Sequence, residues 1–284
     1  LGRFGPYFTQ AHETPWGSAV NYDQSGSEQV RAFVIDSALR WLTDFHVDAL
    51  RLDAIHEIRD DASRAAEPHR HLLAELSDAV GELSDELGKP LSLIAESDLN
   101  DAGVITPTRT MQPFRTPSLG MTAQWTDDVH HALHARVTGE SQGYYADFAA
   151  PDALRRVYEG AFLHNGGWSS FRGSRWGAPV PAGTDPRRFI IFDSNHDQVG
   201  NRATGDRPAA SLTDDAMAAE AALILLSPFT PMLFMGEEWG TRRPFQFFTD
   251  HSEPDLAQAV TQGRRREFAS FGWGADEVPD PQAR

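Results

Sequence analysis

The sequence predicts an α/β fold, part of a (β/α)8 TIM barrel, on three observations. Helical segments alternate with short apolar segments about five times along the chain, which is typical of parallel strands joined by helical crossovers. The apolar segments are nearly continuous, as expected of strands that are buried on both faces. Polar residues gather where most of these strands end, and a barrel builds its active site at that end.

A doubly wound sheet also binds ligands at the carboxyl ends of its strands. That fold is typical of nucleotide-binding proteins with a glycine-rich phosphate loop. Neither GxGxxG nor GxxxxGK[ST] occurs in the sequence. The barrel is therefore the favoured interpretation.

The first predicted elements are a helix, a strand and a second helix. The first helix begins near Ser27, a candidate N-cap, and the strand covers Val47 to Asp53. The second helix is stopped by Gly88 and Pro90. Helical spacing of apolar residues supports both helices, in the first at Val30, Phe33, Val34, Ala38, Trp41, Leu42 and Phe45, and in the second at Leu72, Leu76, Val80, Leu83 and Leu87.

The rest of the chain continues the alternation. "LSLIAES" is a strand that ends on Glu96, and Met121 to Asp128 is a third strand with helical sequence from His130 onward. A helix is predicted over roughly Pro151 to His164. The last elements are the strand "RFIIFDSNHD", the helix "AMAAEAALILL" and the strand "PMLFMGEE", which ends on Glu237 and Glu238.

Composition narrows the classes of partner. The net charge of −16 over 284 residues argues against nucleic acid and anionic membrane, because both bind basic patches. A neutral ligand such as a sugar is compatible with this charge. With no cysteine, the chain has no disulfide, thiolate metal site or cysteine nucleophile. Absence of disulfides fits a cytoplasmic protein.

Three carboxylates are the candidate catalytic groups: Asp53, Glu96 and Asp197, each near the end of a predicted strand. A pair of carboxylates suits glycoside hydrolysis, in which one attacks the anomeric carbon and the other protonates the leaving oxygen. Arg51 lies two residues before Asp53, on the same face of the strand, and would keep Asp53 ionised. The apolar surroundings of Glu96 would raise its pKa and keep it protonated.

Structural roles remain open for each of these residues. Acidic side chains at strand ends are often N-caps of the next helix, and an arginine beside an aspartate is often a simple ion pair. Residue pattern alone indicates a barrel hydrolase or lyase that acts on carbohydrate. The histidines of "DDVHHALH" invite a zinc hypothesis, but the HExxH pattern is absent. We expect no metal and no cofactor.

Several segments carry a resemblance to a known family. "ALRLDAIH", "IAES" and "FDSNHDQVGN" resemble the catalytic segments of the α-amylase clan (glycoside hydrolase family thirteen), in the family's order. "GPYFT", "TPWGSAVNYD", "QWTDDVHHALH", "MGEEWG" and "FFTDH" are similar to the trehalose-releasing members of that clan. The resemblance covers essentially the whole chain.

The resemblance implies a retaining α-glycosidase. Asp53 would be the nucleophile, Glu96 the general acid/base, and Asp197 the group that stabilises the transition state. The two catalytic carboxyls should then lie about 5–5.5 Å apart. The implied substrate-binding residues are Arg51, His56, Glu57, Trp125, Asp127, Asp128, His131, Asn195, His196 and Gln198.

The implied substrate is maltooligosyltrehalose or a related α-glucan, cut at the α-1,4 linkage next to the terminal trehalosyl unit. Two alternatives stay open: another α-glucan enzyme of the clan, branching or debranching, and a non-catalytic carbohydrate-binding relative. Intact Asp53, Glu96 and Asp197 favour catalysis.

One segment of the family is missing. The clan has an earlier strand that ends in Asn-His, and nothing in this sequence matches it. We therefore expect residues 1–284 to be a catalytic barrel domain truncated at its N-terminus, with about strands four to eight. An open barrel leaves strand edges unpaired, so we expect the chain by itself to be unstable or inactive.

Overall fold

The computed structural model describes residues 3–15, 17–61, 70–110, 116–269, 274 and 276–283. These residues form two compact units. Unit 1 contains residues 1–128, 155–190 and 228–230, and unit 2 contains 129–154, 191–227 and 231–284. The prediction of one barrel domain over the whole chain stays a prediction.

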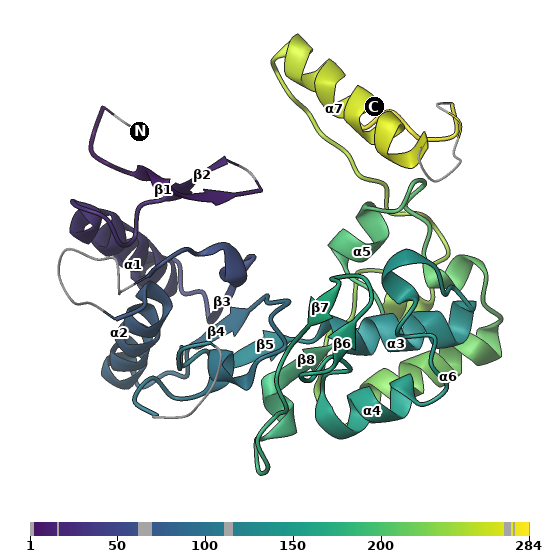
Figure 1. Ribbon diagram of the computed structural model, residues 1–284, viewed down its shortest axis with the longest axis horizontal. Coiled ribbons are helices and arrows are strands. Elements are labelled where there is room, and N and C mark those ends of the chain that lie inside the picture. Colours follow the sequence, from purple (N-terminus) through teal and green to yellow (C-terminus); the bar gives the residue numbers. More distant parts are fainter. Residues whose placement is uncertain are drawn as a thin grey trace. The chain divides into compact units, whose positions relative to one another are not determined.

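A five-stranded sheet is the central feature of the fold (Figure 1). Its strand order is β3 (Ala49–Leu52), β4 (Ser92–Ala95), β5 (Ala123–Trp125), β8 (Phe189–Ile191) and β9 (Thr230–Pro231). The pairs β3–β4, β4–β5 and β5–β8 are parallel. Spatial order follows chain order without the reversal that defines a doubly wound sheet. The α/β prediction is confirmed, and the arrangement is that of part of a barrel.

Helices α1 (Ser27–Asp44) and α2 (Leu72–Leu87) belong to unit 1, where they contact each other beside β3 and β4 (Figure 1). The α2 helix buries Leu72, Leu76 and Val80 and ends at Gly88, as predicted. The N-cap of α1 is Gly26 instead of Ser27. Gly26 has a φ of 81°, which glycine adopts without strain.

The remaining elements of unit 1 are short. They are the antiparallel pair β1 (Phe8–Thr14) and β2 (Gly17–Val20), the hairpin β6 (Trp168–Ser169) and β7 (Ser174–Arg175), and the 3-10 helices η1 (Ile55–Glu57), η2 (Ala102–Ile105) and η4 (Pro186–Arg188). Two helices cross the boundary of the units, α3 (Asp127–Thr138) and α4 (Ala153–Gly160).

Unit 2 continues with the elements that follow β8. These are η3 (Gly143–Tyr145), α5 (His196–Gly200), η5 (Pro208–Ala210), α6 (Asp214–Leu225), η6 (Glu237–Trp239) and α7 (Pro254–Ala269). No helix in the described ranges is long and apolar enough to cross a membrane.

Several predicted boundaries were wrong. The strand expected over Met121 to Asp128 covers only Ala123–Trp125, and α3 already begins at Asp127. The helix expected to reach His164 ends at Gly160, because Ala161 adopts a left-handed φ of 62°. The strand expected over "PMLFMGEE" is reduced to Thr230–Pro231. Pro231 cannot donate a backbone hydrogen bond to a ladder, and Glu237 begins η6 instead of ending a strand.

Candidate active site

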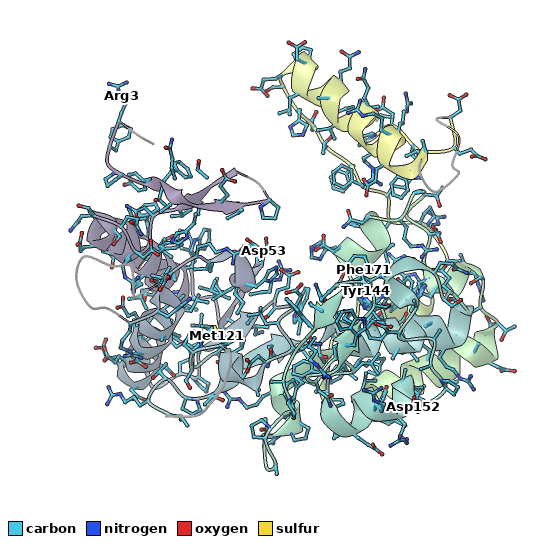
Figure 2. The ribbon with its side chains drawn as sticks, viewed as in Figure 1. Arg3, Asp53, Met121, Tyr144, Asp152 and Phe171 are labelled. Carbon is cyan, nitrogen blue, oxygen red and sulfur yellow. The ribbon has the colours of Figure 1, made fainter. Side chains whose placement is uncertain are left out.

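Asp53 and Glu96 come together because their strands are paired in register. Arg51 lies opposite Ile94, and Leu52 lies opposite Ala95. The ladder continues past both strands, since the Glu96 N–H donates to the Leu52 carbonyl (2.9 Å). The next positions, Asp53 and Glu96, are therefore neighbours at the carboxyl edge of the sheet. Figure 2 shows Asp53 beyond the end of β3.

The Arg51 guanidinium bridges the two carboxylates. Its Nη1 lies 2.5 Å from Asp53 Oδ1, and its Nη2 lies 2.9 Å from Glu96 Oε1. The predicted pairing of Arg51 with Asp53 is confirmed. Its second contact, with Glu96, makes one cation common to both acids.

Burial and hydrogen bonding give the two carboxyl groups different surroundings. The Asp53 side chain is 73% exposed and that of Glu96 is 18% exposed. Burial raises the pKa of Glu96, and the negative charge of Asp53 adds to this effect, although the Ala54 N–H and Arg51 oppose it. This direction agrees with the prediction that Glu96 serves as the acid.

One hydrogen bond to Glu96 comes from a backbone N–H group in a strained conformation. The Ala54 N–H donates to Glu96 Oε2 at 2.7 Å. Ala54 has a φ of 41°, in the left-handed region that residues with a Cβ seldom occupy. This conformation costs about 1–2 kcal/mol, and it points the N–H of the residue after Asp53 at Glu96. This donor could not be predicted from the sequence, because an alanine gives no sign of its backbone angle.

The indole ring of Trp125 packs against the guanidinium of Arg51. The Arg51 Cζ lies 4.4 Å from the centre of the indole ring, and Trp125 is only 6% exposed. It was predicted to bind substrate. The structure shows its contact with Arg51, and its contact with substrate stays a prediction.

His56 and Glu57 lie in η1, shortly after Asp53. His56 Nδ1 is 3.8 Å from Asp98 Oδ1, and Glu57 pairs with Arg59 at 2.9 Å. Asp98 also pairs with Arg172 (3.0 Å), which stacks on Trp176.

The β6–β7 hairpin is therefore tied to the segment that follows Glu96. Trp176 Nε1 donates to the Asp98 carbonyl at 2.6 Å. The same hairpin exposes Trp168 and Phe171. This group was not among the predicted site residues; the aromatic and glycine-rich stretch "NGGWSSFRGSRWGA" was the signal for it in the sequence.

Asp127 and Asp128 begin α3, but Asp128 is buried. Its Oδ2 accepts hydrogen bonds from Asn100 Nδ2 (2.9 Å) and from the N–H groups of Leu163 (2.7 Å) and His164 (3.1 Å). Burial raises its pKa. These bonds give Asp128 a structural role within unit 1, while its predicted contact with substrate stays untested.

The other predicted residues belong to unit 2. Asn195 caps α5 through its Oδ1, which accepts from the N–H groups of Asp197 and Gln198, each at 3.0 Å. His196 and Asp197 are exposed, with His196 Nε2 3.7 Å from Asp197 Oδ1. That Asp197 acts together with Asp53 and Glu96 stays a prediction, as do the roles of Asn195, His196 and Gln198 in binding substrate.

The histidines of α3 take part in packing and ion pairs. The His131 ring lies 4.3 Å from that of Tyr144. His134 Nε2 is 3.0 Å from Glu140, which also pairs with Arg202. Within the described ranges, no three acidic, histidine or cysteine side chains are arranged to hold a metal ion.

Comparisons with known proteins show what the whole chain is similar to. No family model matches the chain. The chain is 52% identical over 282 residues to the malto-oligosyltrehalose trehalohydrolase of Arthrobacter ramosus, covering 99% of this chain and 47% of the relative. It is 49% identical over 283 residues to the protein of that name from Mycobacterium tuberculosis (strain ATCC 25618 / H37Rv), covering 99% and 47%.

The chain is also similar to a solved structure. The crystal structure of a presumptive alpha amylase from Salmonella typhimurium is 40% identical, with a TM-score of 0.81, over 98% of this chain and 44% of that one. The chain spans about half the length of the curated relatives that it matches.

Proposed function

Since the chain belongs to the malto-oligosyltrehalose trehalohydrolase family of the α-amylase clan, we propose that it carries catalytic machinery of a trehalose-releasing glycosidase. The proposed reaction is hydrolysis of the α-1,4 linkage next to the terminal trehalosyl unit of maltooligosyltrehalose, with retention of configuration. The products are trehalose and a shortened maltooligosaccharide, which places the reaction in trehalose biosynthesis.

One observation carries the proposal: two carboxyl groups of unlike environment share a single guanidinium at the ends of adjacent strands. Asp53, exposed and paired with Arg51, is suited to attack the anomeric carbon. Glu96, whose pKa is raised by burial, is suited to protonate the departing glycosidic oxygen. A water then hydrolyses the glycosyl-enzyme, with Glu96 acting as the base.

The proposal extends to residues of α5 and of the β6–β7 hairpin. Asp197 and His196 would bind sugar hydroxyls and stabilise the positive charge of the transition state. The exposed aromatic side chains of Trp168 and Phe171 offer apolar faces to pyranose rings. A neutral glucan is in keeping with the net charge of −16, and a cytoplasmic location, in keeping with a chain without cysteine, is part of the same proposal.

The test is product analysis with a protein of the relatives' full length that carries this sequence. Maltooligosyltrehalose and a plain maltooligosaccharide of equal glucose number are supplied separately, and trehalose release and product anomer are measured. We expect preferential release of trehalose with retained configuration, and loss of turnover in Asp53→Asn. Preferential cleavage of the plain glucan would overturn the trehalose assignment, and an inert parent would favour a binding function.

A further inference from the structure

The segment that follows Glu96 is held from two sides within unit 1. On one side, the Ile55 N–H donates to the Glu96 carbonyl at 3.1 Å, and Ile55 begins η1. On the other side, the β6–β7 hairpin contacts Asp98, which follows Glu96 closely in the chain. The proposed reaction assigns no role to Asp98, although its contacts join the proposed acid's segment to the hairpin.

Asp98, Arg172 and Trp176 form a closed set of contacts. Arg172 lies in the turn between β6 and β7, and Trp176 directly follows β7. Asp98 Oδ2 lies 3.0 Å from Arg172 Nη2, and the Arg172 Cζ lies 4.3 Å from the centre of the Trp176 ring. Trp176 Nε1 in turn donates to the Asp98 carbonyl at 2.6 Å. Both the side chain and the backbone of Asp98 are therefore bound to the hairpin.

The base of the hairpin packs on the same segment. The Ala178 N–H donates to the Asn100 carbonyl at 2.9 Å. Gly177 has a φ of 70°, and a Cβ at this position would lie 1.9 Å from the His164 carbonyl oxygen and 2.8 Å from the Asn100 Cβ. Glycine permits this close approach because it has no Cβ. The hairpin is therefore packed directly on the segment that follows the proposed acid.

The second oxygen of Asp98 faces η1. Asp98 Oδ1 lies 3.8 Å from His56 Nδ1, a distance longer than a hydrogen bond. This ring nitrogen is buried and has no hydrogen-bond partner in the described structure. The Asp98 carboxylate thus lies between the Arg172 guanidinium and the His56 imidazole, so a change at Asp98 affects both.

The hairpin also presents two exposed aromatic side chains. Trp168 is 63% exposed and Phe171 is 59% exposed, and both belong to the proposed substrate site. Arg172 directly follows Phe171, so its ion pair with Asp98 restricts the position of that ring. These rings are not on β3 or β4, the strands that lead to the proposed catalytic carboxyl groups. In the proposed site they would contact sugar units beyond the cleaved bond.

We propose that Asp98 is a positioning residue that acts through Arg172. It fixes the aromatic side chains of the β6–β7 hairpin relative to Glu96, and thereby sets the preference of the enzyme for long glucan chains. Loss of Asp98 displaces the hairpin and weakens the binding of long substrates more than that of short ones. This inference rests on the proposed function.

The experiment uses a protein of the relatives' full length that carries this sequence. Trehalose release is measured from maltosyltrehalose and from maltopentaosyltrehalose, which share the cleaved linkage and differ in glucan length. We expect Asp98→Ala to raise KM for the longer substrate about tenfold, because a hydrogen bond between charged groups is lost. The kcat values and the KM for the shorter substrate should change less than about twofold.

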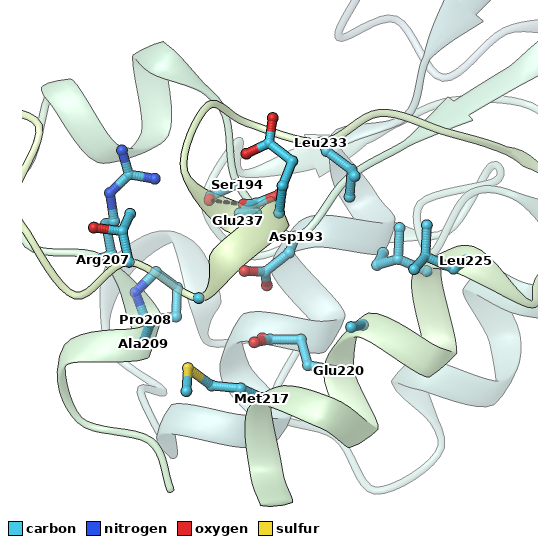
Figure 3. Close-up of a pocket in the computed structure, with 15 residues that line it drawn as sticks. Asp193, Ser194, Arg207, Pro208, Ala209, Met217, Glu220, Leu225, Leu233 and Glu237 are labelled. Carbon is cyan, nitrogen blue, oxygen red and sulfur yellow. Dashed lines mark hydrogen bonds between the residues drawn. The ribbon is translucent and has the colours of Figure 1, made fainter. Parts of the chain in front are cut away.

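Two controls separate positioning from stability. Asp185→Asn alters an exposed aspartate–arginine pair of the same unit and should leave both KM values unchanged. Met217 lines a cavity of about 420 Å³ in unit 2 (Figure 3). Met217→Ala removes packing there and should lower stability without changing the ratio of the two KM values. A changed ratio in Met217→Ala would overturn the inference, because the ratio would then report stability.

Further variants test the route through the hairpin. Arg172→Gln should reproduce the length-dependent loss, and the double variant with Asp98→Ala should be no worse than Arg172→Gln alone. Trp168→Ala removes an exposed ring, leaves the ion pair intact, and should show the same dependence on length if Asp98→Ala does not fold. Equal losses on both substrates, or additive losses in the double variant, overturn this inference alone. A parent that releases no trehalose overturns the proposed function as well.

Discussion

Arg51 contacts both of the proposed catalytic carboxyl groups and fixes their positions relative to each other. Its two terminal nitrogens hold one oxygen of Asp53 and one of Glu96, and Trp125 packs beneath its guanidinium. A planar guanidinium presents donors in a fixed fork. A lysine at this position could not hold both carboxylates with the same geometry.

Glu96→Gln is expected to lower kcat by about 10²–10⁴-fold, because the general acid is lost. The acid form of Glu96 is the active one, so activity of the parent should fall as pH rises through the raised pKa of this group. The alkaline limb of the kcat/KM profile should therefore disappear in the variant. Glu86→Gln, on the exposed face of α2, is the control; an unchanged alkaline limb in Glu96→Gln would contradict the assignment.

Trp125→Leu should reduce kcat with little change in KM, because the arginine loses the ring on which it stacks while the substrate contacts remain. Cation–π contacts contribute on the order of 0.5–2 kcal/mol, which corresponds to about a 2- to 30-fold loss. Trp125→Phe keeps a ring and should retain most of the activity. A double-mutant cycle with Arg51→Lys should be non-additive; strictly additive losses would show that Trp125 acts independently of Arg51.

Some contacts of the candidate site could be predicted from the sequence, and others could not. The Arg51–Asp53 pair follows from a spacing of two on a strand, and the raised pKa of Glu96 follows from its apolar segment. The Ala54 N–H and the contact of Arg172 with Asp98 depend on backbone angles and on segments far apart in the chain. Trp125 was predicted as a site residue, but its contact with Arg51 was not. That contact depends on how the two strands pack, which the sequence does not show.

Among the elements, helix α2 was predicted best, since its apolar period and its stop signal agree. Its C-cap Gly88 has a φ of 58° and donates to the Ser84 and Asp85 carbonyls. Elements near prolines were predicted worst. Pro228 and Pro231 divide the last apolar run, and only two residues of it pair as β9.

Gly88→Ala should lower the free energy of unfolding by about 1–2 kcal/mol, because a Cβ is strained in the left-handed region. Gly81→Ala lies inside the same helix, with nothing within 4 Å of the added Cβ, and should raise it by roughly 0.5–1 kcal/mol. Urea unfolding of both variants measures the two effects. Equal changes of the same sign in the free energy of unfolding would show that the αL conformation of Gly88 does not determine the effect of its substitution.

At the scale of the whole molecule, the order of strands in the sheet is the most informative feature. The α/β class and the sequence of strands and helices could be predicted from periodicity alone. The division of the described chain into two units could not, since it depends on contacts between segments distant in sequence. The terminal strands β3 and β9 each have one neighbour in the described sheet, whereas a closed barrel leaves no strand edge unpaired.

We expect the 284-residue chain alone to release little or no trehalose and to associate through its strand edges, because unpaired edges recruit other strands. A protein of the relatives' full length with the same sequence should be active and monodisperse in comparison. Trehalose release and light scattering measure the two properties. Robust trehalose release by a monomeric 284-residue chain would falsify this expectation.

The bridge made by Arg51 has a consequence for the timing of proton transfer. While Asp53 is ionised, its charge helps to hold the pKa of Glu96 up, and the guanidinium is divided between two anions. In the proposed reaction, an ester formed at Asp53 would remove that charge, so Arg51 would pair with Glu96 alone and the pKa of Glu96 would fall. Glu96, having given its proton to the leaving sugar, would then be stabilised as the anion that deprotonates water. One arginine would thus link the first half of the proposed reaction to the second.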